Sequence, residues 1–160
     1  MVPTANISIR RFTESDLDAV RELIYATIDV CYTDVYPEEA IHFFKDFYAP
    51  ERILRDAKTG FTLVLEEHDR IIATGTIIGD HAFRVFVTPG FQKRGYGKLI
   101  MSKLEKKAGS NGFDTVVLDS SLVSKRFCDD LGYEKVREAF IELPNGKRLD
   151  YYEMKRSLKR

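Results

Sequence analysis

The residues best suited to chemistry lie between positions 85 and 98, where glycines and basic residues follow a short apolar run. Val85-Phe86-Val87 has the composition of a buried strand, and Thr88-Pro89-Gly90 ends it. Gln92-Lys93-Arg94-Gly95-Tyr96-Gly97-Lys98 then opens a helix. A helix start leaves backbone N–H groups without partners and carries partial positive charge, so it stabilises an anion. We therefore predict a phosphate-binding loop here.

The spacing of the glycines separates the nucleotide-binding motifs. A dinucleotide fingerprint G-x-G-x-x-G starting at Gly95 requires glycine at position 100, which is Ile100. A Walker loop ending at Gly97-Lys98 requires glycine at position 92, which is Gln92. The pattern that fits is Gln/Arg-x-x-Gly-x-Gly/Ala, formed by Gln92, Gly95 and Gly97. An ordinary glycine-rich turn between a strand and a helix is the alternative interpretation.

Together with its flanking strand and helix and the later Leu131-Gly132-Tyr133, this pattern resembles the acyl-CoA pyrophosphate loop of the GNAT superfamily of N-acetyltransferases. The resemblance implies that acetyl-CoA is the co-substrate and that its diphosphate binds the main chain of residues 92–97. Lys93, Arg94 and Lys98 add positive charge, and Ser124 is expected to touch the cofactor. No metal is expected.

The resemblance also implies how the acyl donor is held. Two parallel strands splay apart in the family, and we expect free backbone groups of Val85, Phe86 and Val87 to pair with the pantetheine arm. The amide of Val87 is then expected to face the thioester oxygen and to stabilise the oxyanion as the amine attacks. The amine attacks directly, so no covalent enzyme intermediate is expected.

The candidate acid and base are less well defined. Family members often read Phe-Tyr-x-x-x-Gly-Phe/Tyr, with the Tyr protonating the sulfur, whereas this chain has Cys128 at that position. A thiol with an ordinary pKa of about 8.5 is similar in acidity to the leaving CoA thiol, so Cys128 is a candidate proton donor. A buried inert thiol is the alternative. His81 is the candidate base because histidine titrates near neutral pH; the other candidates are Asp80, Asp119, Glu66 and Glu67.

Aromatic residues between positions 29 and 48 are the candidate wall of the acceptor pocket, because this region covers the amine substrate in the resembled family. Tyr32 and Tyr36 are the residues we expect to bind substrate. For Ile41, Phe44 and Phe47 a core-facing stripe is the favoured interpretation. The acceptor is expected to be a small-molecule or peptide amine, and aromatics would suit an apolar or cationic one.

Hydrophobic periodicity supplies the elements that position the loop. We expect a short strand from Ile7, a helix capped at Thr13-Glu14-Ser15-Asp16, and two helical pieces that begin at Pro37 and Pro50. Strands at 61–65, 71–78 and 81–87, a helix ending near Ala108, a strand at 115–118, a helix at 121–131, a hairpin at 133–154 and a frayed basic tail follow. This is the GNAT order, an α/β fold whose mostly antiparallel sheet splays between two parallel strands and carries helices on both faces. Residues 1–160 are predicted to form one domain.

Composition excludes several functional classes. Twenty-five basic residues balance 25 acidic ones, so no overall charge favours nucleic acid or an anionic membrane. No apolar run is long enough for a membrane span and the first residues do not begin a secretory signal, so we expect a cytoplasmic protein with free cysteines. A homodimer is among the expected assemblies, since relatives often dimerise. The alternative function is a catalytically weak acyl-CoA sensor or interaction module.

Overall fold

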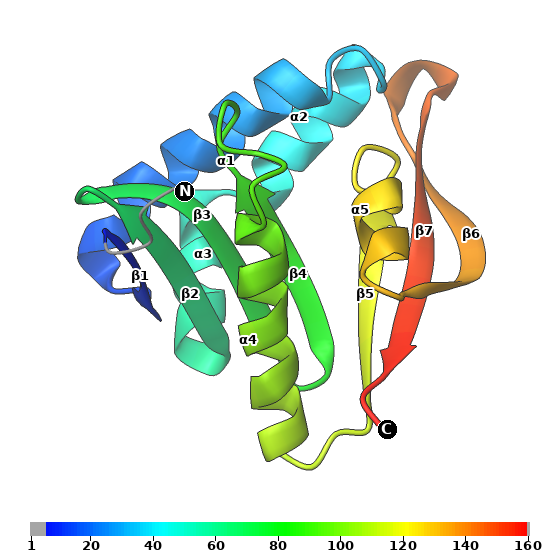
Figure 1. Ribbon diagram of the computed structural model, residues 1–160. Coiled ribbons are helices and arrows are strands. Elements are labelled where there is room, and N and C mark those ends of the chain that lie inside the picture. Colours follow the sequence, from blue (N-terminus) through cyan, green and yellow to red (C-terminus); the bar gives the residue numbers. More distant parts are fainter. Residues whose placement is uncertain (1–5, 160) are drawn as a thin grey trace.

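The structure, a computed structural model, describes residues 6–159. Seven strands form one mixed sheet with helices on both faces (Figure 1). The strands are β1 (Ile7–Arg11), β2 (Phe61–Glu67), β3 (Arg70–Ile78), β4 (His81–Val87), β5 (Thr115–Ser121), β6 (Glu134–Glu142) and β7 (Arg148–Ser157). The α-helices are α1 (Leu17–Cys31), α2 (Glu38–Phe47), α3 (Pro50–Thr59), α4 (Tyr96–Ser110) and α5 (Lys125–Asp130), and short 3₁₀ turns span Glu14–Asp16 and Pro144–Gly146.

The sheet divides where β4 meets β5. Its order is β1-β2-β3-β4-β5-β7-β6, and β4 and β5 are the parallel neighbours among strands that otherwise pair antiparallel. These two strands share one register position, His81 with Val117, beside a 2.9 Å bond from Val117 N to Asp80 O. Beyond it they diverge, as Figure 1 shows. The predicted fold class is confirmed.

A β-bulge lies in β4 next to this divergence. Thr76 pairs with Phe83 and Thr74 with Phe86, so Gly75 faces two residues, Arg84 and Val85. Arg84 has a φ of 55°, which is unusual for a non-glycine residue inside a strand. Bulges bend and twist a strand, and this one is placed where β4 separates from β5.

Two apolar clusters hold the layers together, one on each face of the sheet. Helices α4 and α5 cover one face, and the fully buried Ile100, Met101 and Leu104 of α4 anchor its cluster. Helices α1, α2 and α3 cover the other face, where Ile24, Ile28 and Ile53 are fully buried. The helical spacing of these residues is what directs each helix onto the sheet. Within residues 6–159, no helix is both long and apolar enough to cross a membrane.

The structure changes three of the expected boundaries. Helix α4 begins at Tyr96 rather than at position 92, because residues 88–95 form a loop. Helix α5 begins at Lys125 rather than at position 121, because β5 continues to Ser121, which pairs with Tyr151 of β7. Residues 155–157 belong to β7 and pair with β5, so this part of the expected tail is ordered strand. The capping box at Thr13 and Asp16 is confirmed.

Candidate active site

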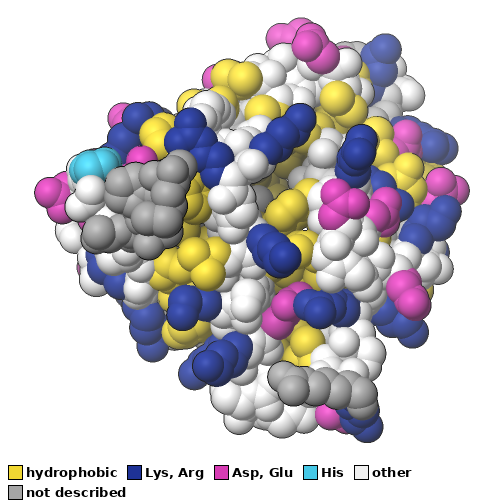
Figure 2. Space-filling view, viewed as in Figure 1, with side chains coloured by type: hydrophobic (Ala, Val, Ile, Leu, Met, Phe, Trp, Pro, Cys, Tyr) yellow, Lys and Arg dark blue, Asp and Glu magenta, His cyan; other side chains and the backbone are white. Residues whose placement is uncertain are grey.

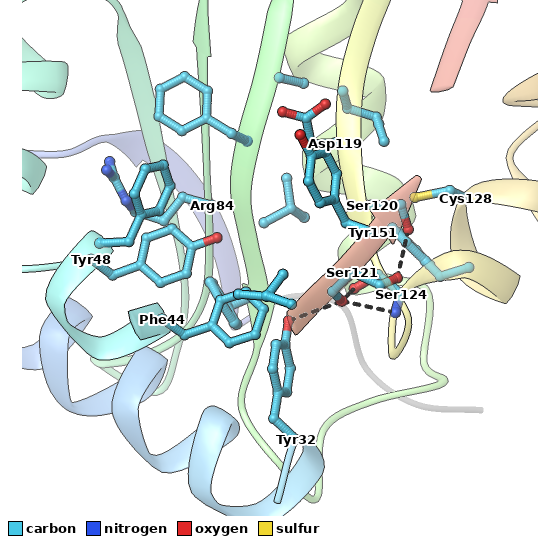
Figure 3. Close-up of a pocket in the computed structure, with 18 of the residues that line it drawn as sticks. Tyr32, Phe44, Tyr48, Arg84, Asp119, Ser120, Ser121, Ser124, Cys128 and Tyr151 are labelled. Carbon is cyan, nitrogen blue, oxygen red and sulfur yellow. Dashed lines mark hydrogen bonds between the residues drawn. The ribbon is translucent and has the colours of Figure 1, made fainter. Parts of the chain in front are cut away.

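A cavity of about 300 Å³ lies between β4 and β5. Its lining comes from both faces of the sheet, with Met101 and Cys128 on the α4 and α5 side and Tyr32 and Phe44 on the α1 and α2 side. Figure 3 shows side chains from β4, β5 and the helices converging on this space. Because the two strands separate here, a molecule bound on one face can reach a molecule bound on the other.

The loop before α4 has unpaired backbone amides, and none of its residues lines the cavity. The first described bond of the helix runs from Leu99 N to Gly95 O at 3.0 Å, which leaves the amides of Tyr96, Gly97 and Lys98 without intrahelical acceptors. Gly95, the N-cap residue, has a φ of 88°, and a Cβ built on it meets nothing within 4 Å. The side chains of Lys93, Arg94 and Lys98 are exposed, and Figure 2 shows basic side chains over this end of α4. The loop therefore has the geometry and charge of an anion site.

Two loop residues also have structural roles that their spacing did not indicate. A Cβ on Gly97 would lie 3.0 Å from the ring of Phe127, so a larger residue there would require this ring to shift and glycine favours the close packing of Phe127. Gln92 Nε2 donates to Val87 O at 3.0 Å and lies 3.6 Å from the sulfur of Cys31. This contact ties the loop to the end of β4.

Strand β4 turns part of its main chain toward the gap beside β5; Val85 and Phe86 line the cavity, and Val87 does not. Thr88 N donates to Ile72 O at 2.9 Å, so the backbone groups of Thr88 face β3. Backbone groups alternate between the two edges of a strand, and those of Val87 therefore point toward the gap beside β5. Val85 has the same orientation, whereas Phe86 pairs with Thr74 of β3 and contributes its ring to the cavity lining.

The thiol of Cys128 lines the cavity but is a weak acid. Its residue is 5% exposed, and burial raises the pKa of the thiol to about 11. The pKa of an ordinary thiol is about 8.5, so proton donation from Cys128 to a CoA thiolate is unfavourable by about two pKa units. The acid role of Cys128 stays a prediction, and this pKa counts against it. Ser124 also lines the cavity and accepts a 3.1 Å hydrogen bond from Ser121 Oγ.

A carboxylate lies at the β5 side of the cavity. Burial raises the pKa of the Asp119 carboxyl above its ordinary value. Asp119 and Tyr151 lie on the same face because Asp119 pairs with Glu153 and Ser121 with Tyr151, and Figure 3 shows the Tyr151 hydroxyl directed toward Asp119. His81 Nε2 is 3.9 Å from Asp119 Oδ2 but does not line the cavity. Asp119 is thus better placed than His81 to meet a ligand.

Aromatic rings form the opposite wall. Tyr32 packs edge-on against Phe44 at 5.0 Å between centroids, and Tyr48 packs edge-on against Phe86 at 5.3 Å. Tyr32 lines the cavity, and its hydroxyl is 3.4 Å from Ser121 Oγ. Tyr36 does not line it: its hydroxyl donates to Asp150 O and accepts from Leu122 N, both at 2.8 Å. Tyr36 therefore bridges two segments of the fold, and its predicted contact with substrate stays a prediction.

The sequence reasoning did not name Arg84 or Tyr151, and it included Tyr48 only as part of the aromatic stretch at 29–48; all three residues line the cavity. One feature of the sequence could have indicated Arg84: it is the single charged residue in the otherwise apolar run from Ala82 to Val87. Tyr48 follows α2 in a stretch whose rings all fit a core stripe, and Tyr151 lies in a hairpin strand whose neighbours are not local. Their placement depends on pairings between distant segments.

Comparisons with known proteins agree with this geometry. The family model described as an acetyltransferase (GNAT) domain matches residues 32–155. No curated protein matches the chain by sequence. Solved structures match the whole fold. A GCN5-related N-acetyltransferase from Rhodopseudomonas palustris has a TM-score of 0.88 at 21% identity, with 99% of each chain covered.

Two further matching structures are described as complexes with coenzyme A or acetyl-CoA. The PaiA N-acetyltransferase from Thermoplasma acidophilum, in complex with coenzyme A, has a TM-score of 0.72 at 18% identity, covering 94% of this chain and 98% of its own. The acetyltransferase yncA from Salmonella typhimurium, with its cofactor acetyl-CoA, has a TM-score of 0.66 at 19% identity, covering 97% of this chain and 95% of its own. At these identities the likeness shows the fold.

Proposed function

Since the chain belongs to the acetyltransferase (GNAT) family, we propose that it moves the acetyl group of acetyl-CoA to a primary amine by direct attack in a ternary complex. The observation that carries the proposal is the cavity between β4 and β5, which is lined from both faces of the sheet. A thioester approaching from the α4 side and an amine approaching from the α1 side meet there without a covalent enzyme intermediate.

The residues around the loop suit the acyl donor. The diphosphate binds the amides at the start of α4, where Gly95 has no Cβ to obstruct it, and Lys93, Arg94 and Lys98 supply charge. The pantetheine amides pair with the free backbone edge of Val85 and Val87, in the position of a missing strand. The amides at the start of α4 have no intrahelical acceptor, whereas the Val87 carbonyl already accepts from Gln92 Nε2 and exchanges that bond if it pairs with pantetheine.

The backbone amide of Val87 stabilises the oxyanion. It points toward the gap, where the thioester carbonyl gains negative charge as the amine attacks. A fixed donor of this kind contributes roughly 10²–10³ in rate. The departing CoA thiolate, with an ordinary thiol pKa of about 8.5, is an adequate leaving group near neutral pH. Cys128, with a pKa of about 11, therefore contributes little as an acid.

Asp119 takes the proton from the amine. Its carboxylate lines the cavity, and the raised pKa makes it a stronger base than an ordinary aspartate. His81 lies beside Asp119 and is the alternative base. A positioned base contributes about 10²–10⁴ in rate, so replacing the one that acts has a large effect and replacing the other a small one.

Steady-state kinetics test the proposal. Thiol release from acetyl-CoA is measured over a panel of amines while both substrates are varied, and the acetylated product is identified by mass spectrometry. A ternary complex gives intersecting double-reciprocal lines. Parallel lines would contradict direct attack. Tight CoA binding in calorimetry without turnover on any amine would instead favour the acyl-CoA sensor.

A further inference from the structure

Arg84 has buried hydrogen-bond donors that the protein itself does not use. Its side chain is 3% exposed, and Nη2 donates to Asp56 Oδ2 at 2.8 Å. Nε and Nη1 are buried and have no partner among the described residues. A guanidinium has five N–H donors, of which Nε carries one and Nη1 two. Three donors of a buried cation are therefore left without an acceptor among the described residues, and a ligand reaches them only if the side chains packed around the guanidinium move.

Packing alone does not account for this arrangement. The guanidinium lies 5.5 Å from the ring centroid of Tyr48 and 5.2 Å from that of Phe83, which stabilises the positive charge but satisfies no N–H in the usual way. Leaving a buried charged donor without an acceptor destabilises a fold, and an apolar side chain would suit an aromatic wall better. The left-handed backbone of Arg84 at the bulge is a second local cost.

The position of Arg84 relates it to the acceptor. Among the described residues that line the cavity, Arg84 is the one cation and Asp119 the one anion. Figure 3 shows Arg84 beside Tyr48 on one side of the cavity and Asp119 on the other, with apolar side chains between them. A ligand with an amino group, a short apolar body and an anionic group matches this order of side chains.

On the basis of the proposed function, we propose that the acceptor is an amino acid whose amino group and carboxylate are separated by a short apolar chain, with its carboxylate on Arg84 and its amino group at Asp119. Asp56 already neutralises part of the charge on Arg84, so a monoanionic carboxylate suits the site better than a dianionic phosphate. The volume of about 300 Å³ must also hold the acetyl group, which limits the acceptor to a small molecule.

Matched pairs of amino acids and their decarboxylated amines test this assignment. Suitable pairs, in which a short chain separates the two groups of the amino acid, are 4-aminobutyrate with propylamine, 5-aminopentanoate with butylamine, and 6-aminohexanoate with pentylamine. We expect kcat/KM to favour the amino acid of at least one pair by about 10- to 100-fold, the range of a charge-assisted hydrogen bond. Because the two amines of a pair differ in basicity, the deciding quantity is how this ratio changes between the wild type and a variant.

Arg84→Met is expected to abolish the preference for the amino acid, and Arg84→Lys to retain part of it. Arg55→Met is the matched control, because Arg55 lies 3.4 Å from the same Asp56 but is 63% exposed and outside the cavity. Its ratio is expected to equal that of the wild type. Thermal unfolding and CoA affinity of each variant show whether the fold and the donor site are intact, and Arg84→Lys covers the case in which Arg84→Met does not fold.

Calorimetry with CoA-saturated protein measures the affinity for both members of each pair, and so tests the preference for the amino acid without turnover. Amino acids that bind more tightly than their decarboxylated partners, with the difference lost in Arg84→Met, support the assignment. Equal binding within every pair, or a ratio unchanged in the Arg84 variants, overturns it. Turnover on decarboxylated amines alone overturns the acceptor class but leaves acetyl transfer standing, whereas selective binding without turnover overturns acetyl transfer alone.

Discussion

Replacing Gly95 with alanine separates the anion-binding role of the loop from the stability of α4. Gly95 is the N-cap of the helix with a φ of 88°, and a Cβ there meets nothing within 4 Å. The cost of Gly95→Ala is therefore conformational and not steric, about 1–2 kcal/mol for an alanine in the left-handed region. For a protein of this length, that corresponds to a melting temperature lower by about 2–8 °C.

Gly112, beyond the other end of α4, is the matched control. Its φ is 91°, and a Cβ on it also meets nothing within 4 Å. Gly112→Ala should thus lower stability by a similar amount, measured by thermal and denaturant unfolding. It lies far along the helix from the amides of Tyr96 and Gly97, so CoA affinity is expected to remain at the wild-type value.

The two variants are expected to differ in CoA binding. In Gly95→Ala the new methyl group projects into open space at the anion site and disfavours the backbone conformation that directs the amides. Loss of one charge-assisted backbone bond weakens CoA affinity by about 10- to 100-fold, measured by isothermal titration calorimetry. Equal CoA affinities in the two variants would refute the assignment of the diphosphate to this loop.

Three other replacements test the remaining roles. Asp119→Asn is expected to lower kcat/KM by about 10²–10⁴-fold. Because the base must be ionised and the pKa of Asp119 is raised, the wild-type rate should fall with decreasing pH at a pH above the ordinary aspartate range, and this decrease should be absent in the variant. A variant whose pH profile keeps the decrease would exclude Asp119 as the base. Cys128→Ala should cost less than about tenfold in kcat, because a thiol with a pKa of about 11 donates poorly, and a loss above a hundredfold would restore Cys128 as the acid. Tyr36→Phe should destabilise the fold by about 1–3 kcal/mol in denaturant unfolding, since Leu122 N loses its acceptor, and a raised KM at unchanged stability would instead indicate contact with substrate.

Much of the fold could be predicted because its signals are local. The apolar alternation before Gly79-Asp80 and after it delimits β3 and β4, and Gly60 ends α3 where the periodicity changes. The helix boundaries were less predictable where strand pairing competed with helix formation. Residues 121–124 read as helix, yet Ser121 pairs with Tyr151 and the helix starts later.

The candidate site was only partly predictable, since residues far apart in the chain form it. The bulge at Arg84 depends on how β4 pairs with β3, and the raised pKa of the Asp119 carboxyl depends on burial among segments that the sequence does not place. Tyr32 and Tyr36 look alike in the sequence, but one lines the cavity and the other is held by Asp150 and Leu122.

The sequence by itself predicted the anion loop and determined the strand and the helix that flank it, because the spacing of Gln92, Gly95 and Gly97 and the apolar run before them are short-range properties of the chain. Only the tertiary structure decided that Gly97 packs closely against the ring of Phe127 and that β4 and β5 share a single register position. It also decided which carboxylate and which cation line the cavity between them. Register, burial and electrostatics are set by contacts between distant residues, and these contacts exist only once the chain has folded.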